Sequence, residues 1–281
     1  YRLTDNCGNT TDIIQQISLN DDVPPVADAL PDLGPFACFA DLPAPDVSIV
    51  QGTDNCGDAV TVTHNGDTDD PGCEGIVIRA YQVTDFCGNS VIVTQNLIIR
   101  DDVAPTAADL DPIGSIQCYA DRPAPDVSIV NATDNCGGAV TVSFVGDSED
   151  PGCTGTVIRT YRLTDVCGNA ADIQQSILID DTTPPTADPI AAIGPFLCVS
   201  DVPAPDISIV TGTQDNCGRA VTVTFDREEA APNCQGFYKR FYLITDDCGN
   251  SSEVMQEIEI NDNIMPTADP LPNIGPFQCL A

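Results

Sequence analysis

The feature that most constrains the fold of this chain is a repeat in the positions of its cysteines. The 281-residue sequence contains 14 Cys, and most of them fall into sets of four that recur about every 80 residues. A period of this length is that of a small folded unit, so the chain is a tandem array. The three complete sets are Cys38, Cys56, Cys73 and Cys87; Cys118, Cys136, Cys153 and Cys167; and Cys198, Cys217, Cys234 and Cys248.

The sequence around the cysteines repeats with the same period. PAPDVSIV occurs twice and returns as PAPDISIV, the TDNCG of residues 53–57 and 133–137 returns as TQDNCG, and the ends of the units share TD-x-CGN. Cys7 is the last cysteine of an earlier unit and Cys279 the first of a later one. We therefore predict the C-terminal end of a partial repeat at 1–22, complete repeats at 23–102, 103–182 and 183–263, and the start of a further repeat at 264–281.

Within one repeat the hydrophobic pattern is that of short strands. Alternating or β-branched runs cover 46–51, 59–65, 75–85 and 90–101, with weaker segments near 35–44. Clusters of Gly, Asp and Asn separate these runs, and no helical period of useful length is present. The pattern predicts an all-β protein, a tandem array of ~80-residue immunoglobulin-like antiparallel β-sandwich domains.

Composition narrows the classes of function. The net charge of −33 disfavours binding to nucleic acids and to anionic membranes. No apolar run reaches the ~18–20 residues of a membrane-spanning helix. The cysteine count, together with many Pro and Gly residues, predicts an oxidising, extracellular compartment and a disulfide framework.

The order of three motifs points to a family. DNCG, then Y-x-x-TD-x-CGN, then D-x-x-PP resembles the HYR-type immunoglobulin-like tandem repeats of large secreted surface adhesins and fibres of Bacteroidota. The resemblance covers the whole chain. It implies an immunoglobulin-like sandwich, export to the cell surface and an adhesive or stalk role. These repeats lack the cysteine that many such repeats carry in the strand after CGN, so the disulfide pairing is not transferred from relatives.

Strand order suggests how the cysteines pair, although four cysteines allow three connectivities. Cys56 and Cys87 lie in loops at one end of the sandwich, and Cys38 and Cys73 lie at the other. Zinc binding and thiol redox chemistry are disfavoured because the chain lacks C-x-x-C pairs and has a single His. Pairing at the same end predicts Cys38–Cys73, Cys56–Cys87, Cys118–Cys153, Cys136–Cys167, Cys198–Cys234 and Cys217–Cys248.

Acidic side chains recur at the boundaries between repeats and in the turns that face them. Oxygen ligands gathered from a linker and two loops are what Ca²⁺ requires, so we predict a calcium site at each boundary. The competing interpretations are that Asp and Asn only form turns by bonding to their own backbone, or that the acidic residues bind another cation or act through their charge alone. The candidate ligands are Asp21, Asp22, Asp54, Asp85, Asp101, Asp102, Asp134, Asp165, Asp181, Asp215, Asp246 and Asp262.

No motif predicts catalysis. The sole histidine, His64, is replaced by Ser143 and Thr224 in the other repeats, and neither G-x-S-x-G nor H-E-x-x-H occurs. We predict a non-enzymatic segment of a long extracellular fibre or adhesin stalk at the cell surface, stabilised by disulfides and stiffened by cations. Its partners would be neighbouring repeats, further copies bundled into a filament, and an unidentified distal target, with no nucleic acid and no membrane insertion. The alternative is a recognition module for glycans or proteins, but the near-constant TDNCG and TD-x-CGN loops favour the stalk.

Overall fold

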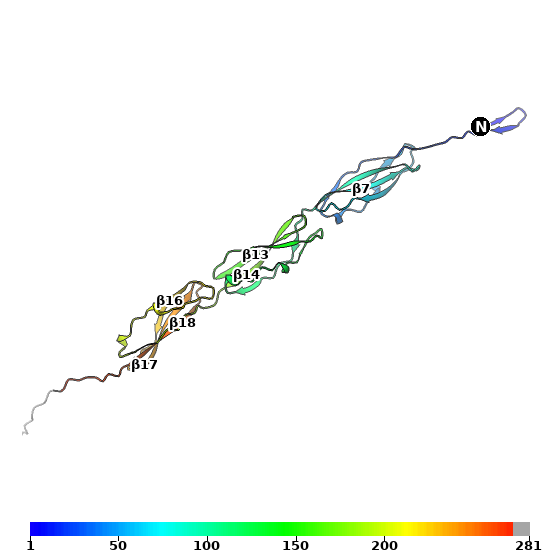
Figure 1. The fold of residues 1–281 in the computed structure, drawn as a ribbon. Coiled ribbons are helices and arrows are strands. Elements are labelled where there is room, and N and C mark those ends of the chain that lie inside the picture. The colour runs from blue at the N-terminus through cyan, green and yellow to red at the C-terminus, as the bar shows by residue number, and fades with distance from the viewer. Residues whose placement is uncertain (272–281) are drawn as a thin grey trace, which may run out of the picture. The chain divides into compact units, whose positions relative to one another are not determined.

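Each complete repeat contains one four-stranded β-sheet (Figure 1). The structure is a computed structural model and describes residues 1–271. The three sheets have the same strand order. They are β4 (Leu33–Phe36), β8 (Ser90–Arg100), β7 (Glu74–Thr84) and β6 (Thr61–Asp67); β10 (Ile113–Ile116), β14 (Ala170–Asp180), β13 (Thr154–Thr164) and β12 (Thr141–Asp147); and β15 (Ile193–Phe196), β18 (Ser251–Asn261), β17 (Gln235–Asp246) and β16 (Val221–Glu228).

The three longer strands of each sheet are antiparallel, as β16, β17 and β18 illustrate (Figure 1). The short edge strand runs parallel to the last strand, with Leu33 opposite Leu97 and Phe36 opposite Ile99 in the first repeat. This parallel edge differs from the purely antiparallel sandwich predicted. The chain can return to that edge in parallel because the whole repeat separates β4 from β8.

A second, thinner layer covers the inner face of each sheet. It is formed by short strand pairs and single turns of 3₁₀-helix rather than by a second broad sheet. Its elements are β3 (Val26–Ala27), η1 (Phe39–Asp41), η2 (Val47–Ile49) and β5 (Gly52–Thr53); β9 (Thr106–Ala107), η3 (Tyr119–Asp121), η4 (Val127–Ile129) and β11 (Ala132–Thr133); and η5 (Val199–Asp201), η6 (Ile207–Ile209) and the bridge between Thr186 and Gln214.

Alternate side chains of the central strands form the core between these layers. Val77, Tyr81 and Val83 of β7 are fully buried, as are Leu97 and Ile99 of β8. They pack against Val50 and Leu42 of the thin layer. The alternation gives each long strand one apolar face, which the second layer removes from water. The prediction of an all-β array of tandem β-sandwich repeats is confirmed.

One predicted strand is wrong. Residues 46–51 form the 3₁₀ turn η2 instead of an extended run. The Asp46 carboxylate accepts hydrogen bonds from the Ser48 amide at 2.9 Å and the Ser48 hydroxyl at 2.6 Å, which closes the turn locally. Only Val50 of this segment is buried, so a single apolar anchor has replaced the expected strand face.

A buried ion pair links the two layers of each repeat. On β13, Arg159 is 2% exposed and donates to Asp147 Oδ1 at 2.8 Å and Oδ2 at 3.0 Å. It also donates to the Pro123 carbonyl at 2.9 Å, in the opposing layer. The hydrogen bonds from Arg159, reinforced by Arg122, hold the pKa of Asp147 below its ordinary value. Arg79 with Asp67, and Arg240 with Glu228, repeat the arrangement.

The lowered pKa of Asp147 predicts a pH-dependent contribution to stability. A carboxyl with a depressed pKa in the folded state stabilises the fold fully above its unfolded pKa of about 3.9, and loses this effect as the pH falls through the folded value. The difference in unfolding free energy between the natural chain and Asp147→Asn should therefore be constant above about pH 5 and shrink below about pH 4. Denaturant titrations of both proteins from pH 7 to pH 2 measure it. A difference that does not change with pH would show that folding does not lower the pKa of Asp147.

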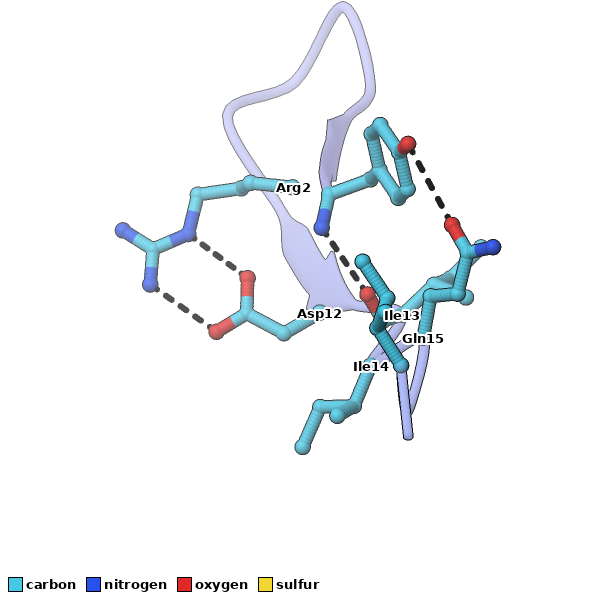
Figure 2. Close-up of a pocket in the computed structure, with 7 residues that line it drawn as sticks. Arg2, Asp12, Ile13, Ile14 and Gln15 are labelled. Atoms are coloured by element: carbon cyan, nitrogen blue, oxygen red, sulfur yellow. Dashed lines mark hydrogen bonds and ion pairs between the residues drawn. The ribbon is translucent and has the colours of Figure 1, made fainter. Parts of the chain in front are cut away.

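The N-terminal partial repeat retains a hairpin of β1 (Arg2–Thr4) and β2 (Thr10–Asp12). Arg2 forms a two-point ion pair with Asp12 at 2.8 and 3.0 Å, while Ile14 beside it is 87% exposed (Figure 2). Asp5 accepts from the Asn9 amide at 2.8 Å, as its counterparts do in complete repeats. The TD-x-CGN turn therefore forms from local sequence, without a core beneath it.

The described chain divides into two compact units whose border runs through the second repeat. Unit 1 comprises Tyr1–Asp109, Val127–Phe144 and Tyr161–Ile173, and unit 2 comprises the remainder. Each connection between complete repeats therefore lies within one unit. Within residues 1–271, no helix has the length and apolar character needed to cross a membrane.

Candidate functional site

The disulfides join successive repeats rather than closing each repeat on itself. The first cysteine of one repeat bonds to the second of the next, and the third bonds to the fourth of the next. The predicted pairs Cys38–Cys73, Cys56–Cys87, Cys118–Cys153, Cys136–Cys167, Cys198–Cys234 and Cys217–Cys248 are therefore wrong. Joint 1, in unit 1, contains Cys38–Cys136 and Cys73–Cys167; joint 2, in unit 2, contains Cys118–Cys217 and Cys153–Cys248.

The prediction was wrong about which cysteine each thiol bonds to, but not about the end of the repeat at which Cys38 and Cys73 lie. Cys38 and Cys73 line one cavity, so they do lie at the same end of their repeat. The end of the next repeat that carries Cys136 and Cys167 lines the same cavity. Each thiol therefore bonds to the facing repeat, with Cα–Cα distances of 5.2 and 5.3 Å.

Asp101 lies at the centre of joint 1. Its amide donates to the Cys73 carbonyl at 2.9 Å, in the first repeat. Its carbonyl accepts from Asn169 Nδ2 at 3.1 Å, in the second. Joint 2 repeats this geometry through Asp181, which bonds to Cys153 and Asn250. Each joint thus contains three covalent connections: two disulfides and the linker itself.

In each joint two carboxylates face each other, and one oxygen of each accepts no hydrogen bond. In joint 1, Asp101 Oδ1 accepts from the Val103 amide and Asp134 Oδ2 from the Cys136 amide. Asp101 Oδ2 and Asp134 Oδ1 are buried and have no partner. One oxygen of each lies within 4.8 Å of the other and of Cys136 Sγ. In joint 2, Asp181 Oδ2 and Asp215 Oδ1 are buried and unpartnered in the same way, beside Cys217.

These unpartnered oxygens are deeply buried. Asp101 is 9% exposed and Asp181 is 6% exposed. Beside Asp101 is a cavity of about 270 Å³ that is lined by both disulfides of joint 1 and by Asp70. Buried carboxylate oxygens without donors are costly, and two that face each other also repel. The donor set and the space fit a hard divalent cation that completes its shell with water.

Other predicted ligands are used differently. The Asp165 carboxylate accepts from the amides of Cys167 and Asn169 at 2.8 Å each, and from Asn169 Nδ2 at 2.9 Å. Asp85 and Asp246 form the same turn in the other repeats. The turn interpretation therefore accounts for this column of residues. Asp102 pairs with Arg100 at 3.6 Å on the surface, while Asp22 and Asp262 are exposed.

The electrostatics of the turns agree with this role. Burial by itself raises the pKa of Asp165, but the hydrogen bonds from Asn169, Cys167 and Gly168 together outweigh it and hold the pKa below its ordinary value. The pKa of Asp85 is lowered in the same balance between burial and the bonds from Asn89. These carboxylates are charged and already accept hydrogen bonds within their own turns, so binding a cation would stabilise them little further.

The N-terminal end of the first complete repeat shows the same residues without a disulfide, and is named here the open end. Asp21, Asp54 and Cys56 cluster as the joint residues do. The Cys56 thiol donates to Asp21 Oδ2 at 3.5 Å, and this bond, followed by burial, raises the thiol pKa. Within the described residues the free thiols are Cys7, Cys56, Cys87, Cys198 and Cys234; Cys279, and the predicted further repeat from residue 272 on, lie outside them.

The two joints differ in the charge of the loop that presents the second carboxylate. The position after TDNCG is Gly138 in joint 1, where an added Cβ would meet Val166 at 3.0 Å. The corresponding residue in joint 2 is Arg219, whose amide donates to Asp215 Oδ2 at 3.1 Å. Its guanidinium pairs with Asp150 at 3.4 Å. Joint 2 therefore has a fixed positive charge on the loop that presents Asp215, and joint 1 does not.

Two parts of this arrangement were not predicted from the sequence. Asp70 was not singled out, although its turn lines the cavity of joint 1. The buried Arg159 with Asp147 was also not foreseen. The sequence does contain a sign of this ion pair. In two repeats an Arg interrupts the apolar third strand in the motif VIR, and an Asp (Asp67 or Asp147) ends the strand before it.

Among solved structures, cadherin ectodomains give remote likenesses. The protocadherin gamma B4 extracellular domain aligns at 10% identity over 86% of this chain and 51% of its own length, with a TM-score of 0.27. Human CDH23 EC21–23 aligns at 14% identity over 79% and 96%, with a TM-score of 0.31. The chain spans about half of the protocadherin domain.

The family comparison is informative. The curated proteins contain no match to this chain. The HYR-like domain with 4 cysteines matches residues 31–99, 106–179 and 195–260, one match in each complete repeat. These matches extend over most of the sequence and agree with the repeated cysteine sets. The chain therefore belongs to the family of HYR-like domains with four cysteines.

Proposed function

We propose that this chain is a structural segment of a long extracellular fibre or adhesin stalk of the cell surface. The observation that carries the proposal is the set of disulfides between repeats. A bond inside a repeat stabilises that repeat, whereas a bond between repeats fixes neighbours to each other. Such linkage benefits a protein that transmits load along its length, as a surface filament does.

Export can be tested together with the linkage. On intact producing cells, a membrane-impermeant maleimide blocks accessible thiols before non-reducing peptide mapping of the recovered protein. We expect peptides that link Cys38 to Cys136 and Cys118 to Cys217, because disulfides persist in oxidising compartments. The proposal fails if the protein is labelled only after lysis, or if these four cysteines are recovered as thiols.

Calcium is the cation that we assign to the joints. Asp101 and Asp134 would hold it in joint 1, and Asp181 and Asp215 in joint 2. A bound Ca²⁺ would supply the positive charge that the unpartnered oxygens lack and would turn their mutual repulsion into attraction to a common centre. The joint would then resist bending, which is the property a stalk requires.

Calcium should raise the stability of the oxidised chain. Extracellular modules bind Ca²⁺ at ~0.1–1 mM, so 10 mM Ca²⁺ should stabilise each joint by about 1.4–2.7 kcal/mol. Calorimetric melting curves with Ca²⁺ and with chelator, at equal ionic strength, measure the effect. Asp134→Asn should remove only the part of the Ca²⁺ stabilisation that comes from joint 1. Asp102→Asn, which changes an exposed carboxylate next to the joint, should leave the stabilisation by Ca²⁺ intact. Identical melting curves with and without Ca²⁺ would contradict the assignment.

A further inference from the structure

The chain displays the same three residue positions in two oxidation states. At the open end, Cys56 is a thiol and donates to Asp21 Oδ2 at 3.5 Å. In joint 1, Cys136 is in a disulfide and the equivalent oxygen, Asp101 Oδ2, has no partner. Cys217 and Asp181 Oδ2 repeat the second situation in joint 2.

The difference follows from the chemistry of the sulfur. When the Cys38 and Cys136 thiols exchange with a small-molecule disulfide such as oxidised glutathione, one S–S bond forms between them. The S–S bond of glutathione breaks, and two molecules of reduced glutathione carry away the two electrons and two protons. The sulfur that remains beside Asp101 has no hydrogen and cannot donate. If the reduced Cys136 thiol donates to Asp101 as Cys56 does to Asp21, the buried carboxylate loses this donor when the joint closes.

We propose that closing the joint disulfide converts a thiol–carboxylate hydrogen bond into a divalent-cation site, with Asp101 Oδ2 and Asp134 Oδ1 as its protein ligands. This inference rests on the cation assigned in the proposed function and adds its regulation. Before oxidation, the thiol proton occupies the oxygen that the cation needs. After oxidation, the cation takes the place of that proton. Because linkage is reciprocal, bound Ca²⁺ also makes the Cys38–Cys136 bond harder to reduce by the same factor.

The test measures Ca²⁺ affinity at joint 1 alone. In an Asp181→Asn/Asp215→Asn background, which removes both ligands of joint 2, calorimetric titration with Ca²⁺ is made on three forms. These are the oxidised chain, the chain reduced with a phosphine, and a reduced chain that also carries Cys38→Ala and Cys136→Ala. The two reduced forms both lack disulfides. They differ only in whether residues 38 and 136 carry thiols.

We expect reduction to weaken Ca²⁺ binding at least tenfold, and the alanine pair to restore most of it under the same reducing conditions. If the alanine pair binds as weakly as the reduced chain, the disulfide acts by ordering the joint and the proposal is overturned. Equal affinity of the oxidised and reduced chains also overturns it. If even the oxidised chain binds no Ca²⁺, the cation assignment itself fails, which is a separate result. Circular dichroism of each form, compared with the oxidised chain, establishes that the sheets are retained.

Discussion

When the oxidised chain is stretched by its two ends, it should release almost no hidden length. The shortest covalent path from Cys38 to Cys248 crosses the Cys38–Cys136 bond, follows residues 136–153, and crosses the Cys153–Cys248 bond. This path extends to only about 60 Å, against roughly 700 Å for the same segment without disulfides. Single-molecule force spectroscopy should record no unfolding steps in the oxidised form and one step per complete repeat after reduction.

Loss of one disulfide tests the staggered arrangement. Without Cys38–Cys136, the shortest path passes through Cys73–Cys167, which adds only about 100 Å. The Cys38→Ser/Cys136→Ser variant should therefore show a small increment. Removing both bonds of joint 1 should release the first repeat completely. Full-length unfolding steps in the oxidised chain would show that the bonds do not lie between repeats.

The second large effect is expected at the buried ion pair of β13. Asp147→Ala leaves the guanidinium of Arg159, which is almost fully buried, without its carboxylate, and should cost about 3–5 kcal/mol of unfolding free energy. Denaturant unfolding followed by circular dichroism measures the loss. The matched control is Asp172→Ala, which breaks the exposed pair with Arg162 and should change stability little.

A double replacement separates lost charge pairing from lost packing. Asp147→Leu with Arg159→Met removes both buried charges and keeps most of the volume. It should recover much of the stability that Asp147→Ala loses, because no buried charge is left alone on β13. If the double variant is as unstable as the single one, the hydrogen bond from Arg159 to Pro123 is the important contact, and the pair with Asp147 is secondary.

The long strands could be predicted from the sequence because their apolar faces alternate over many residues. The predicted segments 75–85 and 90–101 differ by about one residue from Glu74–Thr84 and Ser90–Arg100. The segment 46–51 has a similar β-branched composition, but the hydrogen bonds of Asp46 to Ser48 decide its conformation. Composition alone does not distinguish a short buried strand from a turn with one buried anchor.

The joints were only half predictable for a different reason. Strand order places Cys38 and Cys73 at one end, but it does not reveal that the neighbouring repeat presents two further cysteines there. Likewise, the acidic columns identify Asp101 and Asp165 equally well. Only hydrogen-bond accounting separates the unsatisfied Asp101 from Asp165, whose carboxylate is already used by its own turn.

The staggered disulfides also determine what a protease can achieve. Every peptide bond from Cys38 to Cys248 lies inside at least one disulfide loop, and consecutive loops overlap. A single cut anywhere in that span therefore leaves the two fragments covalently attached. Separating the two ends requires at least three cuts, for example one between Cys38 and Cys73 and one on each side of Cys136, or a reductant as well as a protease. Backbone damage that would sever an ordinary tandem array leaves this one in a single piece.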